Sequence, residues 1–171
     1  MTHESSMKGT LMTADDLVEM EQIKRVKYRY LRAMDTGDFE LLGTLFTEDV
    51  TARFVGGSYD VTVEGRAKLL EYLAVSANAD VVINHNCHHP EIDLTGAATA
   101  EGLWYLQDWY YNRVQKRTVR GAAFYRDRYA KHSGAWKIRH TGYERVWEVV
   151  EENVPPITFT ANVLGQRGRR V

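Results

Sequence analysis

Apolar residues recur at three- and four-residue steps in the first part of the chain, and this spacing predicts two helices. The first is bounded by Thr13, which with Asp16 forms a capping-box signature, and by Gly37, a typical C-terminal stop. Its apolar stripe consists of Leu17, Met20, Ile23, Val26, Tyr30 and Ala33. A second, shorter helix is indicated by Phe39, Leu42, Leu45 and Phe46.

From Val50 the apolar period changes to two, the repeat of a β-strand. Short strands at 51–55 and 59–63 flank Gly56-Gly57-Ser58, a typical hairpin turn. A third helix is expected at 65–77, and long strands at 81–94, 99–116, 120–131 and 136–150. Alternation in the last strand places on one face Lys137, Arg139, Thr141, Tyr143 and Arg145.

Helices that precede a run of long strands indicate an α+β fold, with the helices on one face of a sheet. We expect a cone-shaped α+β barrel in which the N-terminal helices pack on a strongly curved, mostly antiparallel sheet. Such a cone has an open mouth, and concavities of this kind are usual ligand sites. The expected organisation is a flexible arm at 1–12, one domain at 13–150, and a tail at 151–171 placed to cover the cavity or a neighbouring subunit.

The composition is that of a globular protein, with 44% apolar and 11% aromatic residues. A formal net charge of −1 means that the protein lacks the overall positive charge that favours binding to nucleic acids or anionic membranes. Cys87 is the single cysteine, so an internal disulfide is excluded and a reducing compartment is expected. The sequence contains no apolar run typical of a signal peptide or a bilayer span, and we therefore expect a cytoplasmic protein.

Four stretches of the chain carry a resemblance to a known family. They are YRYLRAMDTGDFELLGTLFTEDV, HNCHHPEIDLTGAATAEGLWYLQDW, GAAFYRDRYAKHSGAWKIRH and GYERVW, and together they span nearly all of residues 17–147. In order and spacing they resemble the SnoaL-like group of the nuclear transport factor 2-like superfamily, which includes scytalone dehydratase-like and bile acid 7α-dehydratase-like proteins. The resemblance implies the cone-shaped α+β barrel.

The resemblance also implies catalytic roles for three residues. Tyr30 and Asp35 match a polar pair at the end of the first helix, and His85 matches a strand histidine that acts as general acid/base. An imidazole can exchange a proton near neutral pH, and a carboxylate on its other nitrogen sets the tautomer. On the residues alone, the alternatives are a structural histidine, which is the commoner case, and a core tyrosine with a satisfied hydroxyl. Where scytalone dehydratase-like members carry a second strand histidine, this chain has Trp109 and Tyr110.

Five further residues are expected to contact a substrate. Asp108 and Arg145 match an acidic and a basic cavity residue of the bile acid dehydratase-like branch. Asp108 also shares a strand face with Trp104 and Tyr110, and a carboxylate among large apolar groups needs a partner. Arg145 is the candidate partner, in a buried structural ion pair or at a substrate site. His88 completes the expected substrate-binding set.

The run of residues from His85 to His89 invites a metal interpretation as well. Alternation puts His85, Cys87 and His89 on one strand face, and such ligands suit zinc. The chain offers no matching ligand pair elsewhere, and the resemblance implies neither a metal nor a cofactor. We therefore expect no metal site and no cofactor.

The resulting hypothesis is a cofactor-independent acid/base enzyme, a dehydratase-type lyase or an isomerase. The resemblance implies a hydrophobic cyclic substrate, steroid-like or polyketide-like, and a homodimer or homotrimer. No nucleic-acid or membrane partner is expected. Two alternatives stay open: a non-catalytic protein that binds small molecules, and a structural β-type subunit of a ring-hydroxylating dioxygenase, which the first of the four stretches also resembles.

Overall fold

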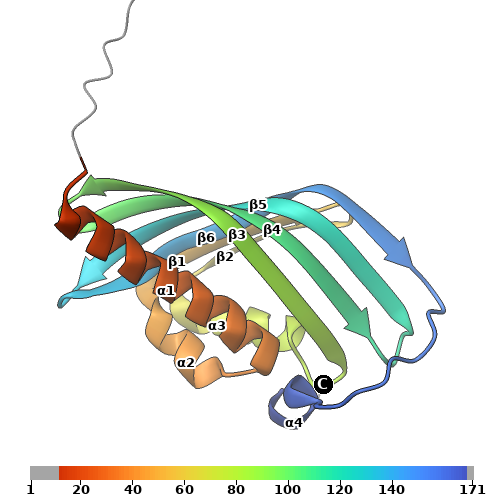
Figure 1. Ribbon diagram of the computed structural model, residues 1–171. Helices are drawn as coiled ribbons and strands as arrows, with labels where there is room; N and C mark the ends of the chain where they lie inside the picture. The colour runs from red at the N-terminus through yellow and green to blue at the C-terminus, as the bar shows by residue number, and fades with distance from the viewer. Residues whose placement is uncertain (1–11, 169–171) are drawn as a thin grey trace, which may run out of the picture.

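The computed structural model describes residues 12–168, which form a six-stranded sheet and four helices (Figure 1). The expected arm at 1–12 lies outside these residues, apart from the exposed Met12. The helices are α1 (Ala14–Thr36), α2 (Phe39–Leu45), α3 (Arg66–Ser76) and α4 (Val163–Arg167). The strands are β1 (Phe46–Gly56), β2 (Tyr59–Glu64), β3 (Val81–Gly96), β4 (Thr99–Asn112), β5 (Arg117–His132) and β6 (Ala135–Glu151).

Helix α1 begins and ends where the capping residues predicted. The Thr13 hydroxyl accepts the Asp16 backbone N–H at 3.1 Å, and the Asp16 carboxylate accepts the Thr13 N–H at 2.8 Å. Gly37 adopts the left-handed conformation at φ 69°, which a side chain rarely tolerates. Asp38 then caps α2 by accepting the Leu41 N–H at 3.0 Å. The break between the two helices is therefore built from local hydrogen bonds.

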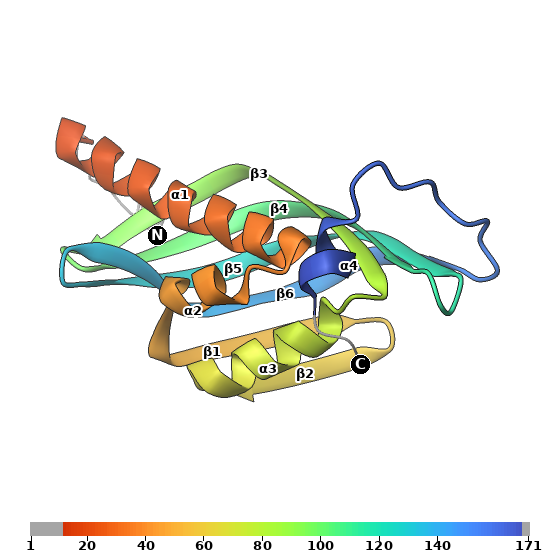
Figure 2. The same cartoon turned by 90° about the horizontal axis from the view of Figure 1, so that it is seen from below.

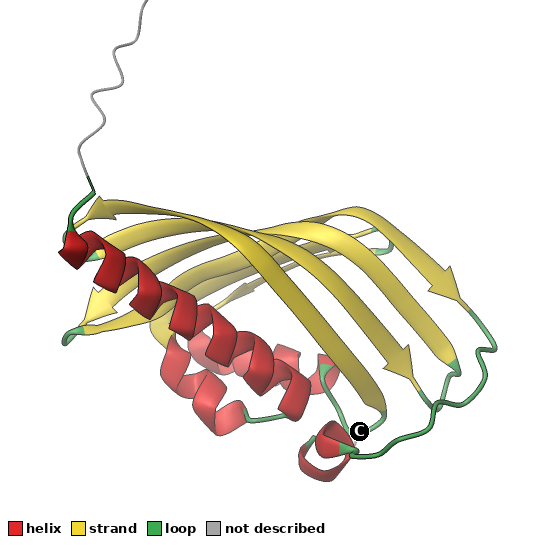
Figure 3. Ribbon diagram, viewed as in Figure 1, coloured by secondary structure: helices red, strands yellow, loops and turns green. Residues whose placement is uncertain are grey.

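The strands form one strongly curved sheet in the order β2-β1-β6-β5-β4-β3. All neighbours are antiparallel except β1 and β6, which are parallel. Figure 3 shows the helices gathered on one side of this sheet. The edge strands β2 and β3 do not pair with each other, so the described sheet curls without closing. The structure thus confirms the expected α+β fold with helices on a curved, mostly antiparallel sheet.

The core lies between the concave face of the sheet and the helices (Figure 2). Helix α1 packs on β3 and β6, and α3 packs on β1 and β2. Ile23, Leu42 and Phe46 are fully buried at the centre of this layer. The predicted stripe was wrong at its first residue, because Leu17 lies near the start of α1 and is exposed. Phe46 also differs from the prediction, since its extended backbone begins β1 rather than continuing α2.

Two bulges in β6 change which side chains face the core. Relative to β5, the strand contains one extra residue at Arg139 and another at Val146. Each extra residue reverses the alternation of faces. The single face predicted for the strand was therefore wrong: Lys137 lies on the opposite face from Arg145, as does Arg139. After the second bulge, Glu148 faces the same cavity as Arg145.

The tail leaves the sheet where β6 ends at Glu151. Its Val154 N–H donates to the Lys116 carbonyl at 2.9 Å, and α4 then packs against α1 and β3. Leu164 anchors this short helix in the core beside Gly37. Within residues 12–168, none of the helices has the length and hydropathy that crossing a bilayer requires.

Candidate active site

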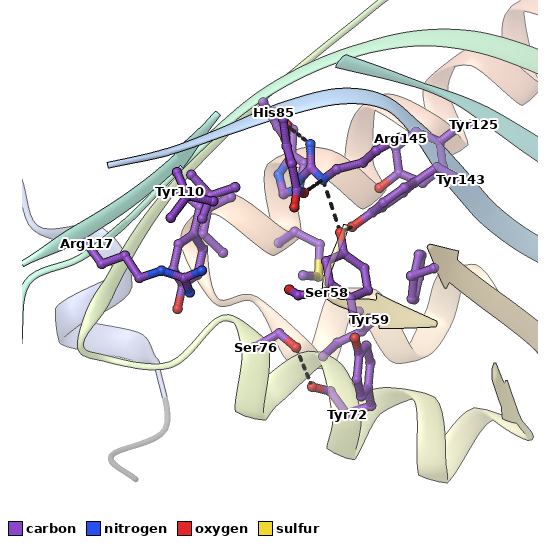
Figure 4. A pocket seen from close by; sticks show the side chains of 18 of the residues that line it. Ser58, Tyr59, Tyr72, Ser76, His85, Tyr110, Arg117, Tyr125, Tyr143 and Arg145 are labelled. Atoms are coloured by element: carbon purple, nitrogen blue, oxygen red, sulfur yellow. Dashed lines mark hydrogen bonds and ion pairs between the residues drawn. The ribbon is translucent and has the colours of Figure 1, made fainter. Parts of the chain in front are cut away.

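A cavity of about 290 Å³ opens between the concave face of the sheet, α1, α3 and the β1–β2 hairpin. Aromatic side chains make up much of its wall, and ten of the lining residues are labelled in Figure 4. Six of the lining residues are tyrosines: Tyr30, Tyr59, Tyr72, Tyr110, Tyr125 and Tyr143. The cavity therefore has an apolar body with hydroxyl groups distributed around it, as small-molecule sites commonly do.

Asp35 and His85 form a hydrogen-bonded pair at this cavity. The His85 ring Nδ1 lies 2.5 Å from Asp35 Oδ1, and the His85 backbone N–H donates to Asp35 Oδ2 at 3.0 Å. The His85 ring lines the cavity and is 11% exposed. Asp35 thus holds both the backbone and the ring of His85, and its carboxylate orients the imidazole. This arrangement leaves Nε2 as the ring nitrogen that can exchange a proton with a ligand.

Asp108 and Arg145 form a second pair, beside His85. Asp108 lies directly opposite His85 in the pairing of β3 with β4. Both oxygens of Asp108 accept hydrogen bonds from Arg145, each at 2.7 Å, and each of the two side chains is only 7% exposed. A bidentate pair of this kind fixes the plane of the guanidinium. The Asp108 carboxylate is therefore neutralised by Arg145, the partner that the sequence suggested.

A glycine lets Arg145 reach across an intervening strand. Arg145 is on β6 and Asp108 on β4, while β5 lies between them with Gly121 opposite Asp108. A Cβ atom at Gly121 would lie 2.5 Å from Arg145 Nη1, so the guanidinium occupies the space that a side chain would fill. The bulge at Val146 also places Glu148 on the same face of the sheet as Arg145, and Glu148 Oε2 lies 3.2 Å from Arg145 Nε.

Two tyrosines extend this network into the cavity. Arg145 Nε donates to the Tyr59 hydroxyl at 3.1 Å, and that hydroxyl lies 2.8 Å from the Tyr143 hydroxyl. In Figure 4 the Tyr59 and Tyr143 side chains meet below Arg145, at the wall of the cavity. Glu148 also accepts the Gly57 N–H at 3.2 Å, which ties the β1–β2 turn to the same network.

Burial keeps several of these groups protonated. It raises the pKa of the Tyr30 hydroxyl well above its ordinary value. The pKa of Tyr143 is likewise raised, first by burial and then by the neighbouring Tyr59. Burial also raises the pKa of the Cys87 thiol to about 11. At neutral pH these phenols therefore act as hydrogen-bond donors, and Cys87 is a thiol rather than a nucleophilic thiolate.

Not all predicted site residues come together. Tyr30, His85, Asp108, Tyr110 and Arg145 line the cavity, and Asp35 contacts it through His85.

Trp104 and His88 lie elsewhere. Trp104 is fully buried and its Nε1 donates to the Tyr129 hydroxyl at 3.1 Å. His88 stacks on Tyr105, and its Nδ1 lies 2.6 Å from that of His89. Neither Trp104 nor His88 lines the cavity, so we no longer assign to them a contact with a ligand there.

The metal interpretation finds no geometric support in the described residues. His89 has a positive φ of 48°, at a bulge between His88 and Glu91 that interrupts the alternation of β3. His85 is held by Asp35 on the cavity side. Over residues 12–168, no three His, Cys, Asp or Glu side chains are grouped so that they could hold a metal ion.

Sequence reasoning missed Tyr59, Tyr143 and Glu148 as members of the site. The alternation of side chains between the two faces of β2 and β6 is the sequence signal that could have indicated them. The bulge at Val146 reverses this alternation, so simple alternation from Arg145 places Glu148 on the wrong face.

Comparison with known proteins adds a family and a set of similar folds. Residues 15–142 match the model of the SnoaL-like domain. A protein from Novosphingobium aromaticivorans, described as a candidate scytalone dehydratase, is 21% identical and superposes with a TM-score of 0.72 over 81% of this chain and 91% of its own. A type 2 hexachlorocyclohexane dehydrochlorinase (LinA) is 14% identical, with a TM-score of 0.73 over 86% and 98% of the two chains. A candidate dehydratase of the NTF2-like family from Streptomyces avermitilis is 18% identical, with a TM-score of 0.64 over 76% and 98%.

Proposed function

The chain belongs to the SnoaL-like domain family, and from this premise we propose that it is an acid/base lyase that needs no cofactor. Its substrate is a hydrophobic cyclic small molecule. The observation that carries the proposal is the 2.5 Å contact between Asp35 and the ring of His85, in a side chain that lines the cavity. Two proteins of similar fold are named as a dehydratase and a dehydrochlorinase, and both names denote eliminations.

The proposed reaction begins at His85. With Nδ1–H donated to Asp35, the Nε2 lone pair accepts a proton from a substrate carbon. The electron pair of the broken C–H bond forms a double bond to the adjacent carbon, and the leaving group departs from that carbon with its own bonding pair. A leaving hydroxyl takes up the proton from His85 and is released as water. An isomerisation shares the first step and returns the proton to another carbon, so the product distinguishes the two reactions.

The other cavity residues fit supporting roles in this proposal. Tyr30 is a protonated phenol and donates to a developing negative charge on oxygen. Arg145 is held rigidly by Asp108, and its Nε orients the Tyr59 hydroxyl at the cavity wall. Tyr110 supplies an aromatic wall. These assignments follow the resemblance to dehydratase-like proteins and the position of the three residues at one cavity.

We also propose that the protein self-associates through the outer face of its sheet. Tyr105 and Trp147 are large side chains that are 43% and 49% exposed, and both strands that carry them lie away from the sheet edges. Light scattering coupled to gel filtration measures the number of copies.

Replacing His85 tests the proposed reaction. His85→Ala removes the base but keeps the backbone N–H that donates to Asp35, so the tie between α1 and β3 persists. We expect elimination from a panel of cyclic alcohols, β-hydroxy ketones and halides to fall by roughly a hundred- to ten-thousandfold. Mass spectrometry of the products measures the rate. His88→Ala, three residues along the same strand and outside the cavity, is the matched control.

Two results speak for the alternatives. Tight binding of the panel with no turnover, and no effect of His85→Ala on affinity, would indicate a non-catalytic binding protein. Stable co-purification with a larger iron-containing chain would indicate a dioxygenase subunit.

A further inference from the structure

His88 and His89 form a pair of imidazoles that the proposed reaction does not use. Their Nδ1 atoms lie 2.6 Å apart, and the two ring planes are nearly perpendicular, at 85°. The pair is carried by β3, an edge strand of the sheet, and neither ring lines the cavity (Figure 1). His88 is half-buried and His89 is exposed, so a ligand can reach the pair from solvent.

A bulge in β3 brings the two rings together. Successive side chains of a regular strand point to opposite faces of the sheet, so neighbouring histidines do not normally meet. The pairing of β3 with β4 shifts between His88 and Glu91, and His89 has a positive φ of 48°. Residues other than glycine seldom adopt this conformation, and those that do are concentrated at functional sites. The bulge therefore places the two imidazoles side by side.

Two aromatic residues on the neighbouring strands support the pair. Tyr105 lies directly opposite His88 on β4, and its ring stacks on that of His88 at 5.6 Å and 21°. The same tyrosine ring meets the His89 ring edge-on, at 5.8 Å and 81°. Phe124 on β5 packs in turn against Tyr105, with 4.6 Å between the ring centres. These contacts restrict the rotation of both imidazoles, so their Nδ1 atoms face each other before a ligand binds.

The short contact shows where the ring lone pairs point. At 2.6 Å one Nδ1 donates its proton to the other, whose lone pair is aimed along the line between them. When the donor ring carries its proton on Nε2 instead, both Nδ1 lone pairs lie on this line and the net charge is unchanged. Within residues 12–168, no third His, Cys, Asp or Glu side chain joins the pair in a group that could hold a metal ion. The pair therefore offers two facing nitrogen ligands.

The number of ligands selects the ion. Zinc takes four ligands in a tetrahedron, and divalent copper prefers a tetragonal set, so two side chains satisfy neither. Monovalent copper is a closed-shell ion that is stable with two collinear ligands, and imidazole suits copper. With each nitrogen about 2 Å from the ion, as in zinc–imidazole bonds, the Nδ1 atoms must separate to about 4 Å. Rotation of the exposed His89 ring provides this movement.

We propose that His88 and His89 bind one monovalent copper ion, Cu(I), between their Nδ1 atoms. In the bound state each ring carries its proton on Nε2, and the neutral pair releases no proton. The copper ion is neither oxidised nor reduced when it binds. The site lies outside the cavity that contains His85, so the inference is independent of the proposed lyase reaction.

Anaerobic titration of Cu(I) against bathocuproine disulfonate, a coloured chelator, tests the site in the full chain. We expect one bound ion per chain in the wild-type protein. His88→Ala should weaken binding by about a hundredfold or more, because loss of an outer-shell partner alone costs a metal site up to that factor. His89→Asn, whose new side chain tolerates the positive φ, should have the same effect. His132→Ala removes an exposed histidine outside the pair and should bind copper as the wild type does.

Cys87 provides the most stringent control, because sulfur is also a ligand for monovalent copper. Cys87→Ser should retain full affinity, and X-ray absorption at the copper edge should show two nitrogen neighbours and no sulfur. Wild-type affinity in both histidine variants, loss of binding in Cys87→Ser, or one ion shared between two chains would overturn the inference. His85→Ala should lose elimination and keep copper, so a failure of the lyase proposal and a failure of the copper site appear in different assays.

Discussion

At the scale of single residues, Asp35 occupies a position that helix energetics do not favour. It lies in the last turn of α1, at the negative end of the helix dipole, and that turn contains no basic residue. Its two hydrogen bonds with the backbone and ring of His85 explain why a carboxylate is there. A residue that contradicts local preference and has a specific long-range partner is a stronger indication of function than a buried side chain.

Gly121 is the second residue whose identity depends on the site. Gly121→Ala places a Cβ 2.5 Å from Arg145 Nη1 and 2.6 Å from the Trp147 carbonyl oxygen, so both the guanidinium and the β6 backbone must move. We expect a loss of about 1–3 kcal/mol in the free energy of unfolding, as for other overpacked positions. The rate of elimination from the substrate panel should fall as well, because Arg145 no longer aligns Tyr59 at the cavity.

Urea denaturation and mass spectrometry of the elimination products measure the two effects. Ala122→Ser, at the next position of β5, is the control for a small added group. Full stability and unchanged elimination rates in Gly121→Ala would show that Arg145 does not need the space.

At the scale of elements, α1 is joined to the sheet by a buried charge. Lys27 Nζ lies 2.8 Å from Asp127 Oδ2 on β5, and both side chains are fully buried. The contact is an ion pair without hydrogen-bond geometry, and Nζ also lies 3.3 Å from the centre of the Tyr125 ring. Asp127 accepts further hydrogen bonds from Tyr129 at 2.7 Å and Thr141 at 2.8 Å. The packing of α1 on the sheet therefore includes a polar contact that fixes its position along the strands.

Breaking this pair should be costly. Lys27→Met leaves the Asp127 carboxylate buried without its counter-charge, and we expect a loss of about 3–5 kcal/mol in the free energy of unfolding. Adding Asp127→Asn should recover much of the loss, because the remaining polar group is neutral. Urea denaturation of the two single variants and the double variant gives the coupling energy. Arg29→Met, at an exposed position of the same helix, should change stability by less than about 0.5 kcal/mol. A loss of stability in the double variant equal to the sum of the losses in the two single variants would contradict the coupling.

At the scale of the whole molecule, the core contains tyrosines that resist ionisation. Burial, first among the causes, raises the pKa of Tyr30, Tyr125, Tyr129 and Tyr143 above the ordinary value near 10. Below about pH 10 the folded and unfolded chains both keep these protons. Above it the unfolded chain loses them while the folded chain retains them, so stability falls as pH rises.

The protein should therefore unfold readily in alkali. Each of these tyrosines contributes a slope of up to about 1.4 kcal/mol per pH unit once the unfolded phenol ionises. Urea denaturation at a series of alkaline pH values measures the slope, and tyrosinate absorbance should rise together with unfolding. Tyr125→Phe should reduce the slope by the contribution of one tyrosine, up to about 1.4 kcal/mol per pH unit. Ionisation of all tyrosines in the folded protein, with no loss of stability, would contradict the assignment.

The sequence alone determined the order of the elements and half of the site. Caps at Thr13 and Gly37, the helical stripe and the change of period at Val50 are local signals, and local hydrogen bonds and burial satisfy them in the structure. Asp35 and His85 were matched by resemblance to a family in which the helix break and the strand face one cavity. Their contact was predictable because both lie in regular elements whose faces follow simple periods.

Only the tertiary structure decided the rest of the site. The bulges at Arg139 and Val146 arise from how β6 pairs with β5, and a one-residue shift in pairing turns every later side chain to the other face. Arg145 reaches Asp108 only because Gly121 lies between them in the folded sheet. Contacts between strands far apart in the chain depend on register, which alternation in a single strand does not reveal.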